Sequence, residues 1–366
     1  MKIIQLLLLS ILFLPSCINH SDKDTGVVKK MEKQHIDIKF AKGFVIDDSN
    51  EDFSLIRINS NNSKFNFSDS LYIAHSSSFD VENKKVLTND LSSLAIQSTT
   101  NLAYLSIFNH INIVKGVAGL QFINSKLLNE KLNRDSVLEI GSSGSVLMES
   151  LLKVNPDLFL IYPFELDNQE KYKTKGIETL LISEYLENSA LARLEWIKLF
   201  GLLLDENESA STYFDRVESD YNTQKVVIDT TKTMFFNLPF KESWNMPNSN
   251  SITANLVKDA GFNYVFTDTI NDNMMRSKEM VWEKAMNCEY WVIIASRPEG
   301  FTLEDLKKEE AIYAEFPSVK NNKVIFCNTS TTDYFTMGVV EPELMLKDLI
   351  HCTDLNYESK YFKVLK

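Results

Sequence analysis

The chain has 366 residues, of which 44% are hydrophobic and 11% aromatic, a composition typical of a globular protein with room for two domains. Its formal net charge of −12 argues against a nucleic acid partner, because binding phosphates requires a basic surface. Beyond Cys17, the cysteines are Cys288, Cys327 and Cys352, whose scattered positions form neither a disulfide framework nor a CxxC metal pair. We expect these three to be buried free thiols.

An export signal is predicted at the N-terminus. Residues 1–16 hold one lysine and an apolar run from Ile3 to Leu14, which is shorter than the ~20 residues that span a bilayer. Cys17 follows directly and resembles the lipid-modified cysteine of a bacterial lipobox. The polar residues 17–36 have the composition of a flexible tether. We therefore expect an exported protein, anchored through lipid at Cys17 and facing the periplasm or the cell surface; a plain secretory signal is the alternative.

Residues 37–88 contain β-prone segments such as IDIKFAKGFVI, FSLIRIN and SLYIAH, separated by clusters of Asp, Ser and Asn. Such clusters are typical of hairpin turns. This pattern predicts a small β-rich N-terminal elaboration. From Leu91 the pattern changes to alternating helices and strands, which indicates a first α/β lobe over residues 89–205.

The first lobe is predicted to alternate helices with buried strands. Residues 158–162 are apolar on both faces, as a strand of a parallel sheet requires. Pro156 ends the preceding helix, because proline restricts the residue before it. The predicted elements are helices over 100–108 and 149–154 and strands over 113–116, 158–162 and 178–182.

Residues 189–222 form the longest predicted helical stretch, with a break at 205–207. The part before the break is apolar nearly all round, so we expect it to be buried. The part after the break has one apolar stripe that runs from Ala210 to Tyr221, with charged residues opposite. We predict that this second helix, within residues 206–230, connects the two lobes.

The second lobe is predicted over residues 231–366. Gly261 caps one of its helices, as glycine commonly does at helix C-termini. Pro342 lies near the first turn of the last helix, where proline is tolerated. The predicted elements are strands over 233–238, 264–266, 290–295 and 323–327 and helices over 252–260 and 343–350.

The two lobes repeat one pattern. In each, a helix and a strand are followed, after a gap, by a helix that opens on Glu149 or Glu279 and leads into an apolar strand. Two similar α/β units suggest two lobes that face each other across a cleft, and such clefts bind small molecules. The predicted fold class is therefore α/β, with two Rossmann-like lobes joined by a single long helix.

Several segments together resemble one family, the substrate-binding proteins of ABC importers for iron(III)–siderophore chelates and vitamin B12. They cover about residues 90–350 in the family's order, whereas residues 37–88 fall outside its pattern. The resemblance implies a stiff helical connector that permits only a small hinge motion. The segments are QSTTNLAYLSIFNHINIVKGVAG, the Glu149 unit ending in NPDLFLIY, ARLEWIKLFGLLLDENESA, WNMPNSNSITANLVKDAGFNYVF, the Glu279 unit, and DYFTMGVVEPELMLKDLI.

The resemblance also implies a role for Glu149 and Glu279. They match the positions at which one glutamate of each lobe docks onto arginines of the permease dimer. Two carboxylates far apart on one face would meet a two-fold-related pair of basic pockets, fixing orientation and speeding encounter. The alternative is that each glutamate only complements the dipole of its helix.

The ligand is expected at the carboxyl ends of the strands, where open α/β sheets bind their ligands. Aromatic side chains would cover the faces of a chelate, and a cation would pair with its anionic oxygens. Trp244 is the favoured aromatic residue, because a polar loop makes a core role less natural. The alternative is ordinary packing for each aromatic residue and a surface or inter-lobe ion pair for Arg297. The candidates are Thr99, Thr100, Tyr162 and Phe164 in the first lobe and Trp244, Met246, Arg297, Tyr334 and Phe335 in the second.

A bare metal ion is not the expected ligand, and no cofactor is expected. Binding proteins for zinc or manganese use clustered histidines and carboxylates, but only His110 and His351 fall in the matching region, in opposite lobes. A metal would arrive already chelated. The sequence GSSGS at 141–145 lacks the Gly-Lys-Ser/Thr of a phosphate loop, and no GxSxG or HExxH motif occurs, so no enzymatic activity is expected.

The predicted function is that of a monomeric, lipid-anchored solute-binding protein that delivers a metal chelate to an ABC permease dimer. An iron(III)–siderophore is the favoured ligand, followed by cobalamin or another corrinoid and then by haem. The alternative of another class is a surface binding or sensory lipoprotein without transport. Such a protein would not need both Glu149 and Glu279.

Overall fold

A computed structural model of the chain describes residues 35–61, 66–76, 78–82, 84–132, 136–142, 144–267, 275–354 and 356–366. The predicted signal peptide, most of the predicted tether and Cys17 lie outside these residues. Among the described helices, none combines the length and apolar character that crossing a bilayer requires.

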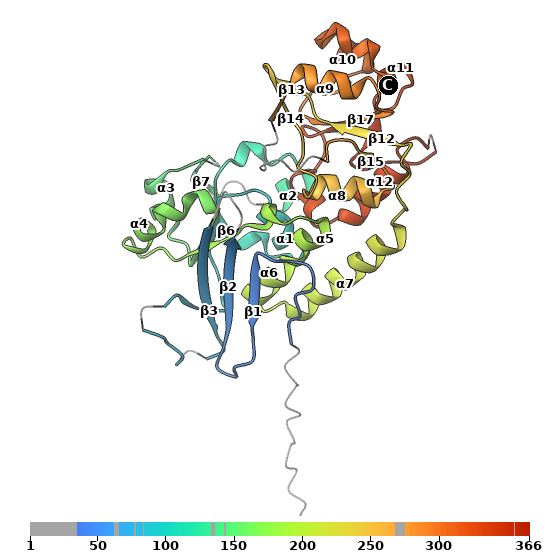
Figure 1. Ribbon diagram of the computed structural model, residues 1–366. Helices are drawn as coiled ribbons and strands as arrows, with labels where there is room; N and C mark the ends of the chain where they lie inside the picture. Colours follow the sequence, from blue (N-terminus) through green and yellow to red (C-terminus); the bar gives the residue numbers. More distant parts are fainter. Residues whose placement is uncertain are drawn as a thin grey trace, which may run out of the picture. The chain divides into compact units, whose positions relative to one another are not determined.

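The first lobe is built on a five-stranded parallel sheet with the strand order β11-β10-β5-β6-β7 (Figure 1). Its central strands are buried on both faces, as their apolar sequences predict. The strands are β5 (Leu94–Ile96), β6 (Val114–Val117), β7 (Leu138–Glu139), β10 (Leu158–Ile161) and β11 (Thr179–Leu181). The helices are α1 (Asn101–Ile107), α2 (Lys126–Lys131), α3 (Met148–Val154), α4 (Gln169–Lys173), α5 (Ala190–Glu195) and α6 (Ile197–Leu203), and a short hairpin, β8 (Gly141–Ser142) and β9 (Ser145–Val146), precedes α3.

The second lobe has its own five-stranded sheet in the order β15-β12-β17-β18-β19, parallel except for β19. A small antiparallel sheet adjoins it. The strands are β12 (Thr233–Phe236), β15 (Asn263–Tyr264), β17 (Tyr290–Ala295), β18 (Val324–Asn328) and β19 (Lys363–Val364), with β13 (Pro239–Phe240), β14 (Ser243–Asn245) and β16 (Met275–Ser277) in the small sheet. The helices are α8 (Ile252–Asp259), α9 (Lys278–Ala285), α10 (Leu303–Glu309), α11 (Pro317–Lys320) and α12 (Pro342–Ile350).

The two lobes follow the same order of elements. In each, the first strand, β5 or β12, lies between the second strand, β6 or β15, on one side and β10 or β17 on the other. The helix that carries Glu149 or Glu279, α3 or α9, leads into this strand, β10 or β17. The predicted α/β fold with two similar lobes is confirmed.

Helix α7 (Asn207–Gln224) carries the chain from the first lobe to the second (Figure 1). One face, with Phe214 and Tyr221, is buried, as its apolar stripe predicts. It also contacts α12 of the second lobe, where Tyr213 Oη donates to the Val340 carbonyl at 3.0 Å and Arg216 lies 3.8 Å from Glu343. The connector is therefore fastened to both lobes.

The N-terminal elaboration is a four-stranded sheet, β1 (Phe44–Asp47), β2 (Phe53–Asn61), β3 (Asn66–Ala74) and β4 (Val86–Thr88). One face, with Ile56, Ile58 and Leu71, joins the hydrophobic core of the protein. The sheet also covers the edge strand β11 of the first lobe. Asp69 accepts a hydrogen bond from the backbone N–H of Leu181 at 3.0 Å, and Lys85 donates to the carbonyl of Thr179 at 2.9 Å. These bonds satisfy edge groups that would otherwise be open to another chain.

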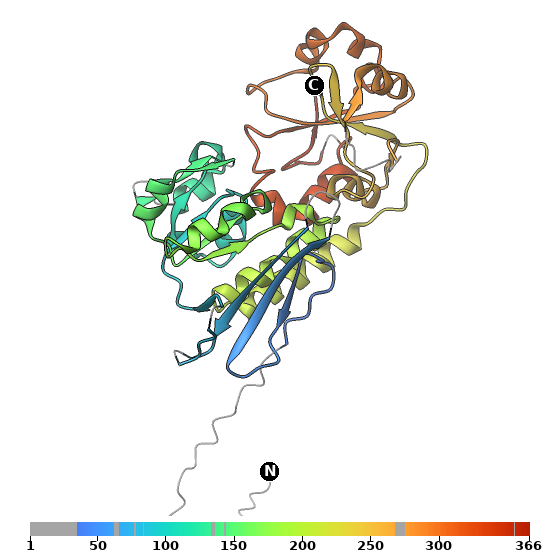
Figure 2. The same ribbon diagram turned by 60° about the vertical axis from the view of Figure 1, so that its left-hand side comes forward.

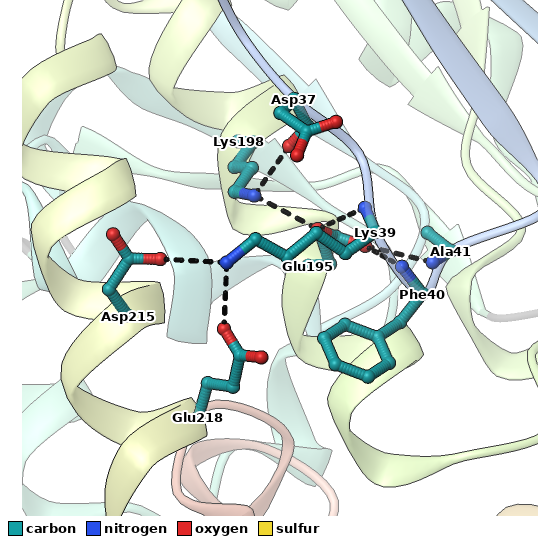
Figure 3. A network of polar contacts seen from close by, with 8 residues as sticks. All are labelled: Asp37, Lys39, Phe40, Ala41, Glu195, Lys198, Asp215 and Glu218. Atoms are coloured by element: carbon teal, nitrogen blue, oxygen red, sulfur yellow. Dashed lines mark hydrogen bonds and ion pairs between the residues drawn. The ribbon is translucent and has the colours of Figure 1, made fainter.

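A segment that we call the strap, residues 35–43, leads into β1 and runs beside α5, α6 and α7 (Figures 1 and 2). Figure 3 shows its polar contacts. The fully buried carboxylate of Glu195 accepts hydrogen bonds from the backbone N–H groups of residues 39–41 at 2.7 to 2.8 Å. It also pairs with Lys198 at 2.9 Å, and Lys39 bonds Glu218 of α7 at 3.0 Å.

The ends of the strap are held in the same way. Asp48 accepts the backbone N–H of Ile36 at 2.9 Å and also bonds His35, so these two residues, which the sequence placed in the tether, belong to the folded unit. Glu187 accepts the N–H of Gly43 at 2.9 Å. A Cβ at Gly43 would lie 2.8 Å from a Trp196 ring carbon, so glycine is required for this close approach.

Candidate functional site

The candidate site lies where the two lobes meet. On the first lobe it is built from the loop after β5 and the residue after β10, which parallel pairing places at the same edge of the sheet. Tyr162 Oη donates to Ser98 Oγ at 2.7 Å, and the Tyr162 N–H donates to Gln97 at 2.8 Å. These bonds fix the Tyr162 ring at the end of its strand, as the sequence predicts for a residue after β10.

Three aromatic side chains group around this position. The Tyr162 ring packs edge-on against Phe164, with 5.7 Å between ring centroids, and lies 5.0 Å from Tyr185. Phe164 is exposed, whereas Tyr162 is only partly so. Burial raises the pKa of Tyr162 well above its usual range, and so does the nearby charge of Glu184. Tyr162 is therefore a neutral hydrogen-bonding group at any physiological pH.

A buried charge pair, Arg193 and Glu184, lies beside the aromatic group. Arg193 Nη2 donates to Glu184 Oε1 at 3.1 Å, and the Glu184 carboxylate is fully buried. Burial lowers the pKa of Arg193, but the charge of Glu184, the hydrogen bond to it and the nearby Tyr104 and Tyr162 together raise the pKa by more, so the guanidinium stays charged. Arg193 Nε and Glu184 Oε2 make no hydrogen bond with any described protein atom.

The second lobe contributes Tyr334 and Phe335, which follow β18. Their rings pack edge-on at 5.0 Å, and Phe335 is 57% exposed. Thr100 Oγ1 of the first lobe donates to the Phe335 carbonyl at 2.9 Å, so the two lobes touch here. A small pocket at the lobe interface is lined by Arg193 from the first lobe and by Thr253 and Tyr334 from the second.

Several predicted residues therefore come together. Thr100, Tyr162 and Phe164 lie on the first lobe's side of the meeting point, and Tyr334 and Phe335 lie on the other. Thr99 is half-buried in the same loop as Thr100. Burial raises the pKa of Tyr334 to about 12, so this phenol is also neutral.

Trp244 and Met246 do not belong to this site. Trp244 is 0% exposed, and its Nε1 donates to the Phe236 carbonyl at 2.8 Å. Its ring packs at 6.0 Å from Trp291 in the core of the second lobe, and Met246 is buried as well. Strand β14 carries the indole inward although the surrounding loop is polar. The expectation that these two residues line the cleft is therefore wrong.

Arg297 forms an ion pair with a residue of its own lobe. Its Nε and Nη2 bond the two carboxylate oxygens of Glu309 at 2.8 and 3.1 Å, a bidentate pair. Its guanidinium also lies 5.6 Å from the Phe301 ring centroid. Arg297 therefore forms a partly exposed ion pair within the second lobe, which agrees with the alternative of a surface ion pair and not with that of an inter-lobe one.

Glu149 and Glu279 occupy equivalent positions. Each is exposed and is the second residue of its helix, α3 or α9. Hydrogen bonds from its own backbone N–H and from Ser277 lower the pKa of Glu279. Both are in the first turn, where the helix dipole favours a negative charge. This placement fits permease docking and a role limited to complementing the helix dipole equally well.

The described residues contain no metal-binding cluster and no exposed cysteine thiol. Within these ranges, no group of three or more His, Cys, Asp and Glu side chains is arranged to hold a metal ion. Cys288, Cys327 and Cys352 are buried and free, as predicted, and burial raises the pKa of each to about 12.

Two residues of the candidate site, Arg193 and Glu184, were not predicted from the sequence. Arg193 lies in a stretch that is apolar nearly all round, which predicted burial but no function. The available signal was the presence of an arginine in a buried helix, because such a charge needs a partner or a ligand. Glu184 follows β11, at the strand edge that also positions Tyr162, and this placement was a second signal.

Comparison with known proteins gives consistent results. A family model described as periplasmic binding protein matches residues 98–331. An uncharacterized lipoprotein, MJ0878 of Methanocaldococcus jannaschii, is 27% identical over 282 residues, which cover 73% of this chain and 66% of the relative. The chain spans less than two thirds of the length of the first curated relatives it matches.

Two solved structures share the fold. The siderophore-binding protein BauB, solved with ferric iron and two molecules of acinetobactin, matches with a TM-score of 0.61 and 13% identity over 83% of this chain and 100% of BauB. The petrobactin-binding protein YclQ of Bacillus subtilis matches with a TM-score of 0.58 and 14% identity over 83% of this chain and 99% of YclQ. At these identities the likeness concerns the fold alone.

Proposed function

Because the chain belongs to the periplasmic binding protein family, we propose that it captures an iron(III)–siderophore-type chelate between its lobes and delivers it to an ABC permease. The family membership confirms the resemblance found in the sequence. Its members bind small ligands and work with permeases, so the chain is a binding protein and not an enzyme.

The observation that carries the proposal is the pairing of aromatic rings with a buried cation where the lobes meet. Phe164 and Phe335 are exposed on opposite lobes, and Arg193 lines a small inter-lobe pocket together with Tyr334. Aromatic faces suit the flat, apolar surfaces of a chelate, and a guanidinium suits its anionic oxygens. We also propose that the metal arrives already chelated and that the protein needs no cofactor.

The same side chains suit cobalamin or another corrinoid, and haem, so the ligand is identified by titration. Residues 18–366 would be titrated with ferric catecholate and ferric hydroxamate siderophores, cyanocobalamin and haem, with isothermal calorimetry as the readout. Saturable sub-micromolar binding of a ferric siderophore supports the proposal. If only cyanocobalamin or haem binds, that compound takes the place of the ferric siderophore as the proposed ligand. If none of them binds saturably, the chelate assignment is overturned.

We propose that Glu149 and Glu279 dock the protein onto the permease during delivery of the chelate. Their exposure at equivalent helix positions in the two lobes supports this role. The double variant Glu149→Lys/Glu279→Lys should abolish chelate uptake by cells and leave chelate binding in solution unchanged. The matched control is Glu170→Lys/Glu283→Lys, which reverses one exposed carboxylate on each lobe outside these positions. Equal uptake by the two double variants would remove the docking assignment, whereas absence of uptake even with the parent protein would favour a surface module without transport.

Anchoring is proposed to use lipid at Cys17, with the protein outside the cytoplasm. The description of relatives such as MJ0878 as lipoproteins supports this proposal. Cys17→Ser should release the protein from the membrane fraction and abolish labelling by a palmitate analogue. Retention and labelling of the Cys17→Ser protein would exclude this cysteine as the lipid site.

A further inference from the structure

The outer face of the N-terminal sheet carries a groove with an excess of positive charge. We call it the basic groove. It is lined by four cations, one carboxylate and several uncharged side chains of β2 and β3; the cations are Arg57, Lys84, Lys85 and Lys173, and the carboxylate is Asp69. The whole chain has a formal net charge of −12, so this grouping of cations departs from the rest of the composition.

Strand pairing builds the groove. Arg57 on β2 is directly opposite Ser70 on β3, and Asn59 is opposite Ser68. Tyr72 of β3 pairs with Val86, so Lys84, two residues earlier, lies beside Ser70. Because neighbouring strands are about 4.8 Å apart, Arg57 and Lys84 flank Ser70 in one row, with hydroxyl and amide groups between the cations.

The other face of the same sheet is buried against the first lobe, so only this face is open. Lys173 reaches the groove from the last turn of α4.

Two carboxylates in or near the groove, Asp69 and Asp47, already have partners within the protein. The Asp69 carboxylate bonds Lys85, Gln169 and the backbone N–H of Leu181. Asp47 approaches Arg57 only to 3.7 Å, and both side chains are largely exposed. Among the described residues, neither Lys84 nor Lys173 has an ion-pair partner for its side chain. The groove therefore has cations available for an external anion.

The chain outside the structure indicates which anion. The described part begins at His35, which Asp48 holds at the end of β1 in the same sheet. Cys17 is 18 residues earlier, so an anchor there would keep this sheet within about 60 Å of the lipid surface, even with the intervening chain fully extended. A membrane surface presents many phosphates at once, which matches several cations spread along an open groove.

We propose that the basic groove binds the phosphate groups of anionic lipids and so holds the N-terminal sheet against the membrane. This contact goes beyond the proposed ligand capture and acts in addition to lipid at Cys17. Each cation near an anionic bilayer strengthens binding roughly fivefold, so removal of three should weaken it roughly 100-fold. The attraction is electrostatic and weakens as salt is added.

The test uses residues 18–366, which contain the complete described unit and no lipid site. Co-sedimentation is measured with vesicles of phosphatidylcholine alone and with vesicles that also contain phosphatidylglycerol. The protein should bind only the second kind, and the variant R57Q/K84Q/K173Q should bind roughly 100-fold more weakly. The control K126Q/K308Q/K320Q removes the same charge from exposed lysines elsewhere and should bind like the parent protein. Circular dichroism verifies that both variants are folded.

Three results would overturn the proposal: equal loss of binding in the two triple variants, equal binding to both kinds of vesicle, or no binding to either. Saturable binding of inorganic phosphate or glycerol phosphate at the groove, without vesicle binding, would instead assign it to a soluble anion. The chelate titration contains no vesicles, so its outcome is independent of this one.

Discussion

Phe335 and Phe240 are both exposed phenylalanines of the second lobe, 57% and 74% exposed. Only Phe335 adjoins the inter-lobe hydrogen bond from Thr100. Phe335→Ala should therefore weaken chelate binding about 10-fold, as the loss of one aromatic contact does, whereas Phe240→Ala should leave it unchanged. Calorimetric titration of the two variants measures the difference. Identical dissociation constants for both variants would place the ligand away from Phe335.

A substitution of Trp244 tests whether this residue stabilises the core or contacts the ligand. Trp244→Phe removes the donor to the Phe236 carbonyl and part of a large buried ring. We expect a loss of about 1–3 kcal/mol in the free energy of unfolding, with chelate affinity unchanged. Urea denaturation and titration on the same preparation measure both quantities. A large loss of affinity at unchanged stability would contradict the core assignment.

The sequence predicted half of the site for a physical reason. Tyr162 and Phe335 were expected at the site because they lie at or beyond the ends of predicted strands, and strand ends converge on one edge of a parallel sheet. Trp244 was misplaced, because a polar loop does not reveal that its short hairpin turns the indole inward. The partner of Arg297, Glu309, is 12 residues away in sequence, and hydropathy carries no information on such a pair.

At the scale of elements, periodicity was sufficient to predict most of the fold. The strand β17 and the helix α8 were located to within a residue, since their apolar residues follow the burial that the structure shows. The strand predicted at 264–266 is instead β15, Asn263–Tyr264, because the pairing to β12 ends there. The contacts of the strap were not predictable, since Glu195 and residues 39–41 are more than 150 positions apart.

Glu195 governs the docking of the strap. Glu195→Gln keeps the side-chain volume but replaces one acceptor oxygen with an amide that donates, facing backbone N–H groups that already donate. Hydrogen exchange of the amides of residues 39–41 should accelerate, while exchange in β17 stays slow. The control Glu218→Gln breaks only the pair with partly exposed Lys39 and should cost less than about 1 kcal/mol. Unchanged exchange at 39–41 in Glu195→Gln would show that other contacts hold the strap.

For the whole molecule, the joint between α7 and α12 decides how the lobes are held. Glu343 of α12 is buried there and lies 3.8 Å from Arg216 of α7. Burial raises the pKa of Glu343 to about 7, an effect that outweighs the opposing influence of Arg216. Around neutral pH the joint therefore contains a carboxyl group that is only partly ionised.

The direction of the resulting pH dependence follows from proton binding. Between the unfolded pKa of 4.5 and the folded value of about 7, the folded state binds more protons at Glu343 than the unfolded chain does. The contribution of this residue to the free energy of unfolding therefore falls as pH rises through that window. Above pH 7 the ionised Glu343 carboxylate is buried and lowers the free energy of unfolding. Below pH 4.5 the group is protonated in both states and this destabilisation is absent.

Glu343→Gln removes this cost without changing the size of the side chain. The variant should be more stable than the parent by about 2 kcal/mol at pH 8, and the difference should shrink toward zero at pH 5. Urea denaturation of both proteins at the two pH values measures it. Glu208→Gln, at an exposed position of α7, is the control and should show no such pH-dependent difference. If Glu343→Gln is instead destabilised at pH 8, the ionised carboxylate bonded to Arg216 is what fastens the connector to the second lobe.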